Sequence, residues 1–312
     1  MKIIIFGSNG LVGSSLVRTL KQSNEDFTII PSTRNDANLF SLKSTREFIN
    51  KHRPNLIINA AAKVGGILAN NVNRTEFILE NLKINMNILE SIIDHPHTHL
   101  INLGSSCIYP LNAKDPINEE SLMTGVLEST NSPYAMAKLA AIEIGDAMSK
   151  QHGTNVLNLM PTNLYGPNDN FSYESSHVIP GLISRMHNAK ITHSKQFNLW
   201  GTGKPLREFL FVDDLSDAIQ FLINQNITNG LYNIGSGEEI TIYNLVNKIK
   251  DIIGFDGEIV CDLSKPDGNP RKLLDNSRIN SLGWKSSTSL DEGLMKTYKW
   301  FLTNFIQQDA PK

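Results

Sequence analysis

A glycine-rich loop between a predicted strand and a predicted helix is the feature that most constrains the fold. Residues 2–6, Lys-Ile-Ile-Ile-Phe, form a largely β-branched run that is typical of a buried parallel strand. Gly7, Gly10 and Gly13 follow at once, and apolar residues then recur at helical spacing. In this setting the glycines allow a tight turn, a close backbone approach to a pyrophosphate, and close packing of helix on strand. The loop predicts a dinucleotide-binding unit in preference to an accidental glycine-rich turn.

Strands and helices alternate along the first half of the chain. Further strands are predicted at 27–30, 56–59, 99–103 and 156–160, and helices at 45–52, 76–94 and 134–152. Alternation at this spacing predicts an α/β fold, a Rossmann-type doubly wound parallel sheet.

The rhythm changes near residue 171, after which elements are shorter and are separated by loops rich in glycine, proline and asparagine. Helices are predicted there at 242–253 and 290–305. We expect a dinucleotide-binding Rossmann domain at 1–170. Residues 171–312 are expected to form mainly a smaller substrate-binding lobe, from which a strand or helix could return to the Rossmann sheet.

Composition excludes several classes of function. A net charge of −2 over 312 residues provides no basic surface for nucleic acid or membrane, so neither is expected as a partner. The two cysteines, Cys107 and Cys261, do not suggest a disulfide framework. There is no signal-peptide pattern and no apolar run near the ~20 residues that span a bilayer, so we expect a cytoplasmic protein. Three histidines between His95 and His99 match no zinc spacing, and no metal is expected.

Two hydroxyls and a thiol follow the predicted strand at 99–103, in the heptapeptide Gly104-Ser-Ser-Cys-Ile-Tyr-Pro110. Open α/β sheets place ligands at the carboxyl ends of their strands. Alone, the heptapeptide favours an ordinary turn with a buried, inert cysteine, because free cysteine usually behaves as a small hydrophobe. If the segment is extended, Ser105 and Cys107 face the same side and Ser106 points away.

Tyr134 and Lys138 open the helix that follows, and residues four apart lie on one helix face. We expect the ammonium to lower the pKa of the phenol, so that Tyr134 donates a proton to a carbonyl oxygen while hydride arrives at carbon. Ser105 would be the second hydrogen-bond partner of that oxygen. Such a pair is common by chance, and its meaning comes from its position after a hydroxyl-bearing strand end.

The end of the second strand bears on the choice of cofactor. It continues as Pro-Ser-Thr-Arg34, with no acid to hold a ribose diol, and a base there suits a 2′-phosphate. NADP(H) is therefore preferred, with Arg34 either a contact of the 2′-phosphate or a solvated surface charge.

Together, these residues resemble the extended short-chain dehydrogenase/reductase family and, more narrowly, its GDP-L-fucose synthases. Asn9 stands where some relatives carry arginine. The resemblance extends from residue 1 to about 300 and includes long motifs. These are Ala60-Ala-Ala-Lys-Val-Gly-Gly-Ile67, Gly104-Ser-Ser-Cys-Ile-Tyr-Pro110, Pro161-Thr-Asn-Leu-Tyr-Gly-Pro-Asn-Asp-Asn-Phe171, Ser176-His-Val-Ile-Pro180, Trp200-Gly-Thr-Gly-Lys-Pro-Leu-Arg-Glu-Phe209, Val212-Asp-Asp-Leu215 and Lys265-Pro-Asp-Gly-Asn-Pro-Arg-Lys-Leu-Leu-Asp275.

The resemblance implies a homodimeric, NADPH-dependent epimerase-reductase that converts GDP-4-keto-6-deoxy-D-mannose to GDP-L-fucose. It implies that Cys107 and His177 are the acid/base pair that inverts C3 and C5, whose protons are acidic because both lie next to the C4 carbonyl. A thiolate base needs a nearby cation, and histidine can return the proton. Without the resemblance, His177 would more simply be a histidine at the edge of the core. The expected catalytic residues are Ser105, Cys107, Tyr134, Lys138 and His177.

The ligand contacts are expected in two groups. For the cofactor they are Gly7, Ser8, Asn9, Gly10, Leu11, Val12, Gly13, Arg34, Leu103, Gly104, Ser105, Ser106, Lys138, Pro161, Thr162, Asn163, Leu164 and His177. For the substrate they are Asn163, Arg185, Trp200, Arg207 and Asp267. Arginine forks match phosphate oxygens and tryptophan offers an apolar face, although each of the substrate residues could instead be an ordinary loop residue.

Two other classes of function stay open. One is another NAD(P)-dependent nucleotide-sugar epimerase or reductase that stops after a single step, in which the chemistry of Cys107 or His177 would be absent. The other is a non-enzymatic dinucleotide sensor, which would be expected to lack an intact set of Ser105, Tyr134 and Lys138.

Overall fold

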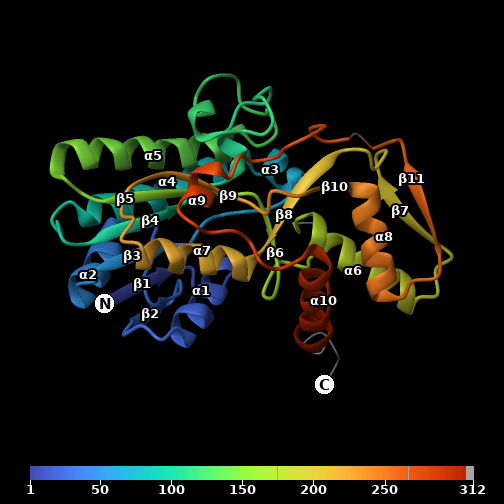
Figure 1. Cartoon of the computed structure of the whole chain (residues 1–312), viewed down its shortest axis with the longest axis horizontal. Coiled ribbons are helices and arrows are strands. Elements are labelled where there is room, and N and C mark those ends of the chain that lie inside the picture. The colour runs from blue at the N-terminus through green and yellow to red at the C-terminus, as the bar shows by residue number, and fades with distance from the viewer. Residues whose placement is uncertain (174, 266, 307–312) are drawn as a thin grey trace.

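A six-stranded parallel sheet forms the centre of the molecule (Figure 1). The computed structural model describes residues 1–173, 175–265 and 267–306; Pro266 of the 265–275 motif and residues 307–312 lie outside the described residues. The strand order is β2-β1-β3-β4-β5-β9. These strands are β1 (Lys2–Phe6), β2 (Thr28–Ser32), β3 (Leu56–Asn59), β4 (His99–Leu103), β5 (Val156–Pro161) and β9 (Gly230–Ile234).

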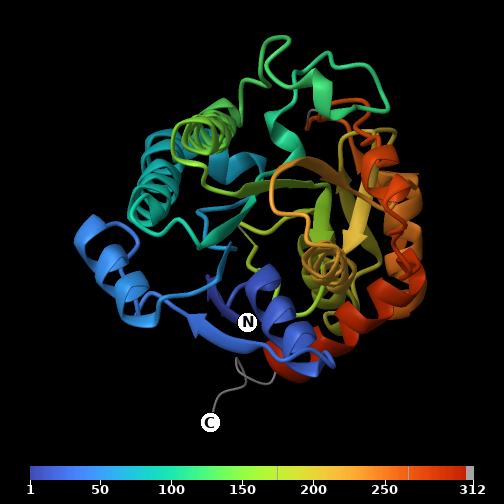
Figure 2. The ribbon, with the colours of Figure 1, turned by 60° about the vertical axis from the view of Figure 1, so that its left-hand side comes forward.

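Helices cover both faces of this sheet (Figure 2). On one face lie α1 (Leu11–Gln22) and α7 (Val212–Asn224). On the other lie α2 (Leu42–His52), α4 (Arg74–Ile92) and α5 (Ser132–His152), and the short α3 (Ile67–Val72) precedes α4. The prediction of a doubly wound Rossmann-type fold is confirmed.

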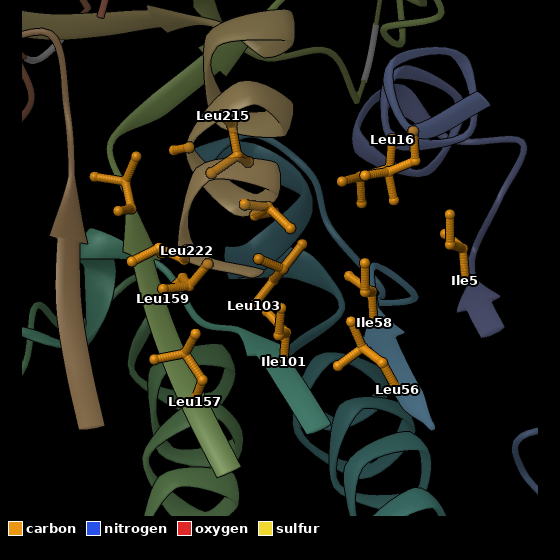
Figure 3. Close-up of a cluster of buried hydrophobic side chains, with 14 of the residues drawn as sticks. Ile5, Leu16, Leu56, Ile58, Ile101, Leu103, Leu157, Leu159, Leu215 and Leu222 are labelled. Atoms are coloured by element: carbon orange, nitrogen blue, oxygen red, sulfur yellow. The ribbon is translucent and has the colours of Figure 1, made fainter. Parts of the chain in front are cut away.

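Side chains of the sheet alternate between two apolar cores. Ile3 and Ile5 of β1 pack with Leu16 of α1 and Leu222 of α7, as Figure 3 shows for part of this core. Ile4 and Phe6 of the same strand point to the opposite face and pack into the second core, against α2, α4 and α5. Because successive strand residues point to opposite faces, a continuous apolar run is what a strand buried on both faces requires.

A smaller lobe packs at the other end of the molecule, around its own apolar core. It contains a sheet of order β10-β8-β6 and a parallel pair of β11 with β7. Its elements are β6 (Asn163–Tyr165), α6 (Val178–Ile191), β7 (Gln196–Trp200), β8 (Leu206–Phe211), β10 (Glu239–Thr241), α8 (Ile242–Ile253), β11 (Glu258–Asp262) and α10 (Leu290–Trp300), which continues as a π-helical turn at Phe301–Phe305. Among the described residues, no helix is both long and apolar enough to cross a membrane.

The second half of the chain also contributes to the main sheet. β9 pairs with β5, α7 packs on α1, and the short α9 (Ser277–Ser281) lies against β9. The division into domains at residue 170 stays a prediction, because helices and strands beyond it belong to both cores.

Candidate active site

The glycine loop lies at the point where the strand order reverses, between β1 and β3. Gly7 has φ +75°, and a Cβ there would lie 2.8 Å from the backbone of Ala60, which follows β3. A Cβ on Gly13 would collide with the Gly7 carbonyl. Gly10 differs, since its nearest neighbour would be an ordinary 3.5 Å away. Two glycines are thus required by packing, and the third leaves the backbone open to a ligand.

The residues of this loop fit a dinucleotide. The N-cap of α1 is Gly10, which provides no side-chain cap, and no acidic residue lies in the first turn. The helix N-terminus therefore offers backbone N–H groups and a positive dipole end to phosphates. Beside it the buried Ser8 hydroxyl has no hydrogen-bond partner among the described residues, and neither has the Ser32 hydroxyl at the end of β2. Buried hydroxyls are normally satisfied, so both suit contact with a polar ligand.

Arg34 lies exposed in the turn after β2. The turn itself is fixed by Asp36, which accepts hydrogen bonds from the Thr33 amide at 2.8 Å and the Thr33 hydroxyl at 2.7 Å. Within the described ranges Arg34 has no ion pair, so its guanidinium is available to a 2′-phosphate or to solvent.

The heptapeptide departs from the extended path assumed above. β4 ends at Leu103, and Ser106–Ile108 form a 3-10 turn in which the Ser105 hydroxyl accepts from the Cys107 amide at 3.2 Å. The same-side argument from strand alternation was therefore wrong for Ser105 and Cys107. Both residues nevertheless act on Tyr134, since Ser105 hydrogen-bonds the phenol and Cys107 is near enough to raise its pKa. Ser106 is buried.

Tyr134 and Lys138 lie in the first turns of α5, beside the end of β4. The Lys138 ammonium is 2% exposed, donates to the Leu103 carbonyl at 2.7 Å, and lies 5.8 Å from the centre of the Tyr134 ring. Burial lowers the pKa of Lys138 to about 8.

The expectation that Lys138 lowers the pKa of Tyr134 was wrong for this arrangement. Burial raises the pKa of the phenol above its usual range, the nearby Cys107 raises it further, and a hydrogen bond with Ser105 only partly opposes this. The ammonium points at the Leu103 carbonyl and does not offset the desolvation. A neutral phenol is the form that can donate a proton.

The Arg207 guanidinium lies near the Cys107 thiol. Burial lowers the pKa of Arg207, while the neighbouring Cys107 and Asp267 raise it, which places both acidic groups beside the guanidinium. Arg207 also donates to its neighbouring Leu206 carbonyl at 2.7 Å. The guanidinium is thus near the thiol, and its expected contact with the substrate stays a prediction.

His177 is the N-cap of α6, at the end of a loop that packs against the 60–67 motif. The Gly66 amide donates to the Ser175 carbonyl at 3.2 Å, and a Cβ on Gly65 would touch both Ser175 and the Phe77 ring. Phe77 in turn packs edge-on against Tyr134 at 6.4 Å. These contacts connect the segment that precedes His177 to Phe77, and through Phe77 to Tyr134. The ring is exposed, yet the atoms around it lower the pKa of His177 by desolvation.

The expected substrate residues separate into two groups. The Arg185 guanidinium lies 5.2 Å from the centre of the half-exposed Trp200 ring, and Lys265 lies 5.9 Å from the same ring. Two cations around one aromatic face suit an anionic ligand with a flat base. Asp267, by contrast, accepts from the amide and hydroxyl of Thr202, at 2.9 and 2.7 Å, so both of its oxygens fasten the loop after β7.

Glu208, which was not among the expected site residues, holds two of the expected cofactor contacts, Thr162 and Asn163. The Glu208 carbonyl accepts from the Thr162 hydroxyl at 3.2 Å and the Asn163 amide at 2.8 Å. The fully buried Glu208 carboxylate accepts from the amides of Gly237 and Leu274. Glu208 stands inside a quoted motif, which was the available signal. Of the other expected contacts, Leu103 and Gly104 lie at the end of β4, Pro161 ends β5, and Leu164 lies in β6.

The histidines of the 95–99 run do not converge. His95 lies 2.7 Å from the Asn50 amide oxygen, and His99 begins β4 beside Asn155. Within residues 1–173, 175–265 and 267–306, no group of three or more metal-ligating side chains gathers.

The buried ammonium of Lys138 makes the free energy of unfolding depend on pH in the alkaline range. Because the pKa of Lys138 falls from 10.5 to about 8 on folding, the folded state binds fewer protons between these values. The free energy of unfolding, compared with that of Lys138→Met, should therefore rise with pH across this window, by up to ~3 kcal/mol at 1.36 kcal/mol per unit. Urea unfolding at a series of pH values measures it, with Lys150→Met, an exposed position of α5, as control. If the difference in unfolding free energy between the wild type and Lys138→Met does not change with pH, the lowered pKa of Lys138 is contradicted.

Comparison with known proteins shows the family of the chain. Residues 3–235 match the NAD dependent epimerase/dehydratase family. A curated relative, GDP-L-fucose synthase 1 of Arabidopsis thaliana, is 47% identical over 97% of this chain and 94% of its own length.

Two solved structures are also similar. A GDP-L-fucose synthetase from Naegleria fowleri, bound to NADP, has a TM-score of 0.90 and 29% identity, over 100% of this chain and 95% of the other. A GDP-6-OMe-4-keto-L-xylo-heptose reductase from C. jejuni has a TM-score of 0.90 and 32% identity over 97% of each chain. The family match covers more than half of the sequence and the relatives span nearly all of it. The chain therefore belongs to the NAD dependent epimerase/dehydratase family, within which it resembles the GDP-L-fucose synthases.

Proposed function

We propose that this enzyme converts GDP-4-keto-6-deoxy-D-mannose to GDP-L-fucose, by inversion at C3 and C5 followed by reduction at C4 with NADPH. The observation that carries the proposal is the convergence of Cys107 and Arg207 with Ser105 and Tyr134. The base Cys107 with the cation Arg207 thus lies close to the proton donor Tyr134 with its hydrogen-bond partner Ser105. Inversion next to a carbonyl and reduction of that carbonyl need these two pairs of groups.

In the epimerisation, the Cys107 thiolate removes a proton from one face of the sugar ring, and the Arg207 guanidinium stabilises the thiolate charge. The negative charge that develops on the C4 oxygen is stabilised by hydrogen bonds from Ser105 and Tyr134. His177 then returns a proton to the opposite face. Since C3 and C5 flank the same carbonyl, one set of residues serves both positions.

In the reduction, Tyr134 donates its proton to the C4 oxygen, and Lys138 holds the helix that carries Tyr134 against β4. The hydride for C4 would come from NADPH when it is bound. The glycine loop, Ser8 and Arg34 would hold the cofactor, and Arg185 with Trp200 would hold the GDP part of the substrate.

The single-step reductase is the second candidate, favoured by the similarity to a GDP-heptose reductase. Incubation with NADPH and GDP-4-keto-6-deoxy-mannose, with the product identified by NMR, separates the two. GDP-L-fucose supports the proposal. A GDP-6-deoxy sugar that keeps the original configuration at C3 and C5 contradicts it and supports the reductase.

Replacement of the thiol tests the epimerase half. Cys107→Ser should reduce deuterium incorporation at C3 and C5 from heavy water by about a hundredfold or more, because a serine hydroxyl is a far weaker base. NADPH binding should be unchanged. Cys261→Ser, in β11, is the matched control and should exchange like the wild type. Wild-type exchange in Cys107→Ser would remove the thiol from the mechanism.

Removal of the phenolic oxygen tests the reductase half. Tyr134→Phe should slow NADPH oxidation by about a hundredfold or more, the usual contribution of a positioned proton donor. Exchange at C3 and C5 should persist at a lower rate, because Cys107, His177 and Ser105 are intact while one of the two hydrogen bonds to the C4 oxygen is lost. Oxidation of NADPH at the wild-type rate would contradict the role given to Tyr134.

We further propose that the enzyme is a cytoplasmic homodimer built on α4 and α5. Leu79 and Met86 of α4 and Ile93 at its C-cap are exposed at heptad spacing, which is an apolar stripe of the kind that packs against another helix. A groove of about 340 Å³ between α4 and α5 is lined by Ile78 and Met136. Both cysteines are free thiols, as suits a reducing compartment.

A charge on this stripe should separate the subunits. Met86→Lys should elute as a single chain in size-exclusion chromatography with light scattering, because burial of a lysine in an apolar interface is unfavourable. Met295→Lys, an exposed methionine of α10, should remain dimeric like the wild type. A wild-type monomer, or a dimer in Met86→Lys, contradicts this interface.

A further inference from the structure

A buried hydrogen bond fixes the far end of the heptapeptide. The Tyr109 hydroxyl donates to the Asn233 amide oxygen at 2.6 Å, and the exposed fractions of the two residues are 1% and 0%. Tyr109 follows the 3-10 turn that carries Cys107, and Asn233 lies in β9, paired with Met160 of β5. The turn is thus joined to a strand of the main sheet that comes from the second half of the chain.

The orientation of the Asn233 amide is fixed by its other partners. Its nitrogen donates to the Ile117 carbonyl at 2.9 Å and to the Asp275 carbonyl at 3.1 Å, which leaves the amide oxygen for Tyr109. The backbone N–H of Asn233 donates to the Glu119 carboxylate at 2.9 Å. Because every polar group of the side chain is used, Asn233 presents its acceptor at one fixed place.

The other end of the heptapeptide is held separately. Leu103 is fixed by Lys138, and Ser105 lies against Tyr134, so the groups assigned to reduction depend on contacts between β4 and α5. Cys107 lies between the two ends, in the turn closed by the bond from the Tyr109 amide to the Ser106 carbonyl at 3.3 Å. The thiol position therefore depends on where Tyr109 is anchored.

We propose that Tyr109 and Asn233 are a positioning pair that sets the Cys107 thiol for epimerisation, while the Lys138–Leu103 contact independently sets the groups for reduction. This inference rests on the proposed function. Loss of the Tyr109 hydroxyl then lets the turn shift and leaves the Asn233 oxygen without its donor. Small displacements of a reacting group are costly because reaction requires near-attack geometry.

The test is Tyr109→Phe, which removes one oxygen and retains the buried ring. Deuterium exchange at C3 and C5, without NADPH, should fall roughly tenfold or more, while the NADPH dissociation constant is unchanged. Assays are run at a temperature at which circular dichroism shows the variant folded.

A mixing experiment separates positioning from general damage. Excess Tyr134→Phe enzyme, which is expected to epimerise without reducing, supplies the inverted ketone to Tyr109→Phe. The rate of NADPH oxidation by Tyr109→Phe in this mixture should return to within about twofold of wild type in the same mixture. A merely structural defect in the site would slow reduction as well and would not be rescued.

Tyr165→Phe is the matched control. Its hydroxyl is also buried, and it donates to the Leu290 carbonyl at 3.5 Å in the smaller lobe, away from the heptapeptide. It should exchange like the wild type. If Tyr109→Phe exchanges at the wild-type rate, or loses reduction in the mixture to the same extent as exchange, the inference is overturned and the proposed function stands. If the wild type itself shows no exchange, the proposed function and this inference fall together.

Discussion

The hydrogen bond from the buried Lys138 ammonium to the Leu103 carbonyl is the contact on which the arrangement of the site depends. It joins the start of α5 to the end of β4, so that Tyr134 faces the residues that follow the strand. If α5 moved along the sheet, this bond would break and the ammonium would be left buried without a partner. Such a state is strongly unfavourable. The position of the phenol is therefore set by an electrostatic requirement as well as by apolar packing.

Two further polar contacts complete the frame. Arg207, from the smaller lobe, lies beside the Cys107 thiol, and Asn233, from β9, holds Tyr109. Both residues belong to the second half of the chain, yet they act on a segment that follows β4. The site thus draws on residues from both halves of the chain, and residues beyond 170 also contribute to both apolar cores.

The sequence predicted what depends on local chemistry. The strand, glycine loop and helix at the N-terminus, the pairing of Tyr134 with Lys138, and the long helices were all found because their signals lie within a few neighbouring residues. The path of the heptapeptide was mispredicted, since a Ser105 side chain that accepts from the Cys107 amide favours a 3-10 turn over extension. The effect of Lys138 on Tyr134 was also mispredicted, because burial of the phenol outweighs a distant ammonium. Glu208 and Asn233 were not predicted because their partners are remote in sequence, and the place of Glu208 inside a family motif was the one signal for it.

The central claim is that one carbonyl oxygen, held by Ser105 and Tyr134, serves both inversion and reduction. The isotopic composition of the product formed by the wild-type enzyme in heavy water with unlabelled NADPH tests it most directly. We expect GDP-L-fucose with deuterium at C3 and C5 and protium at C4. A product with protium at C3 and C5, or with deuterium at C4, would contradict it.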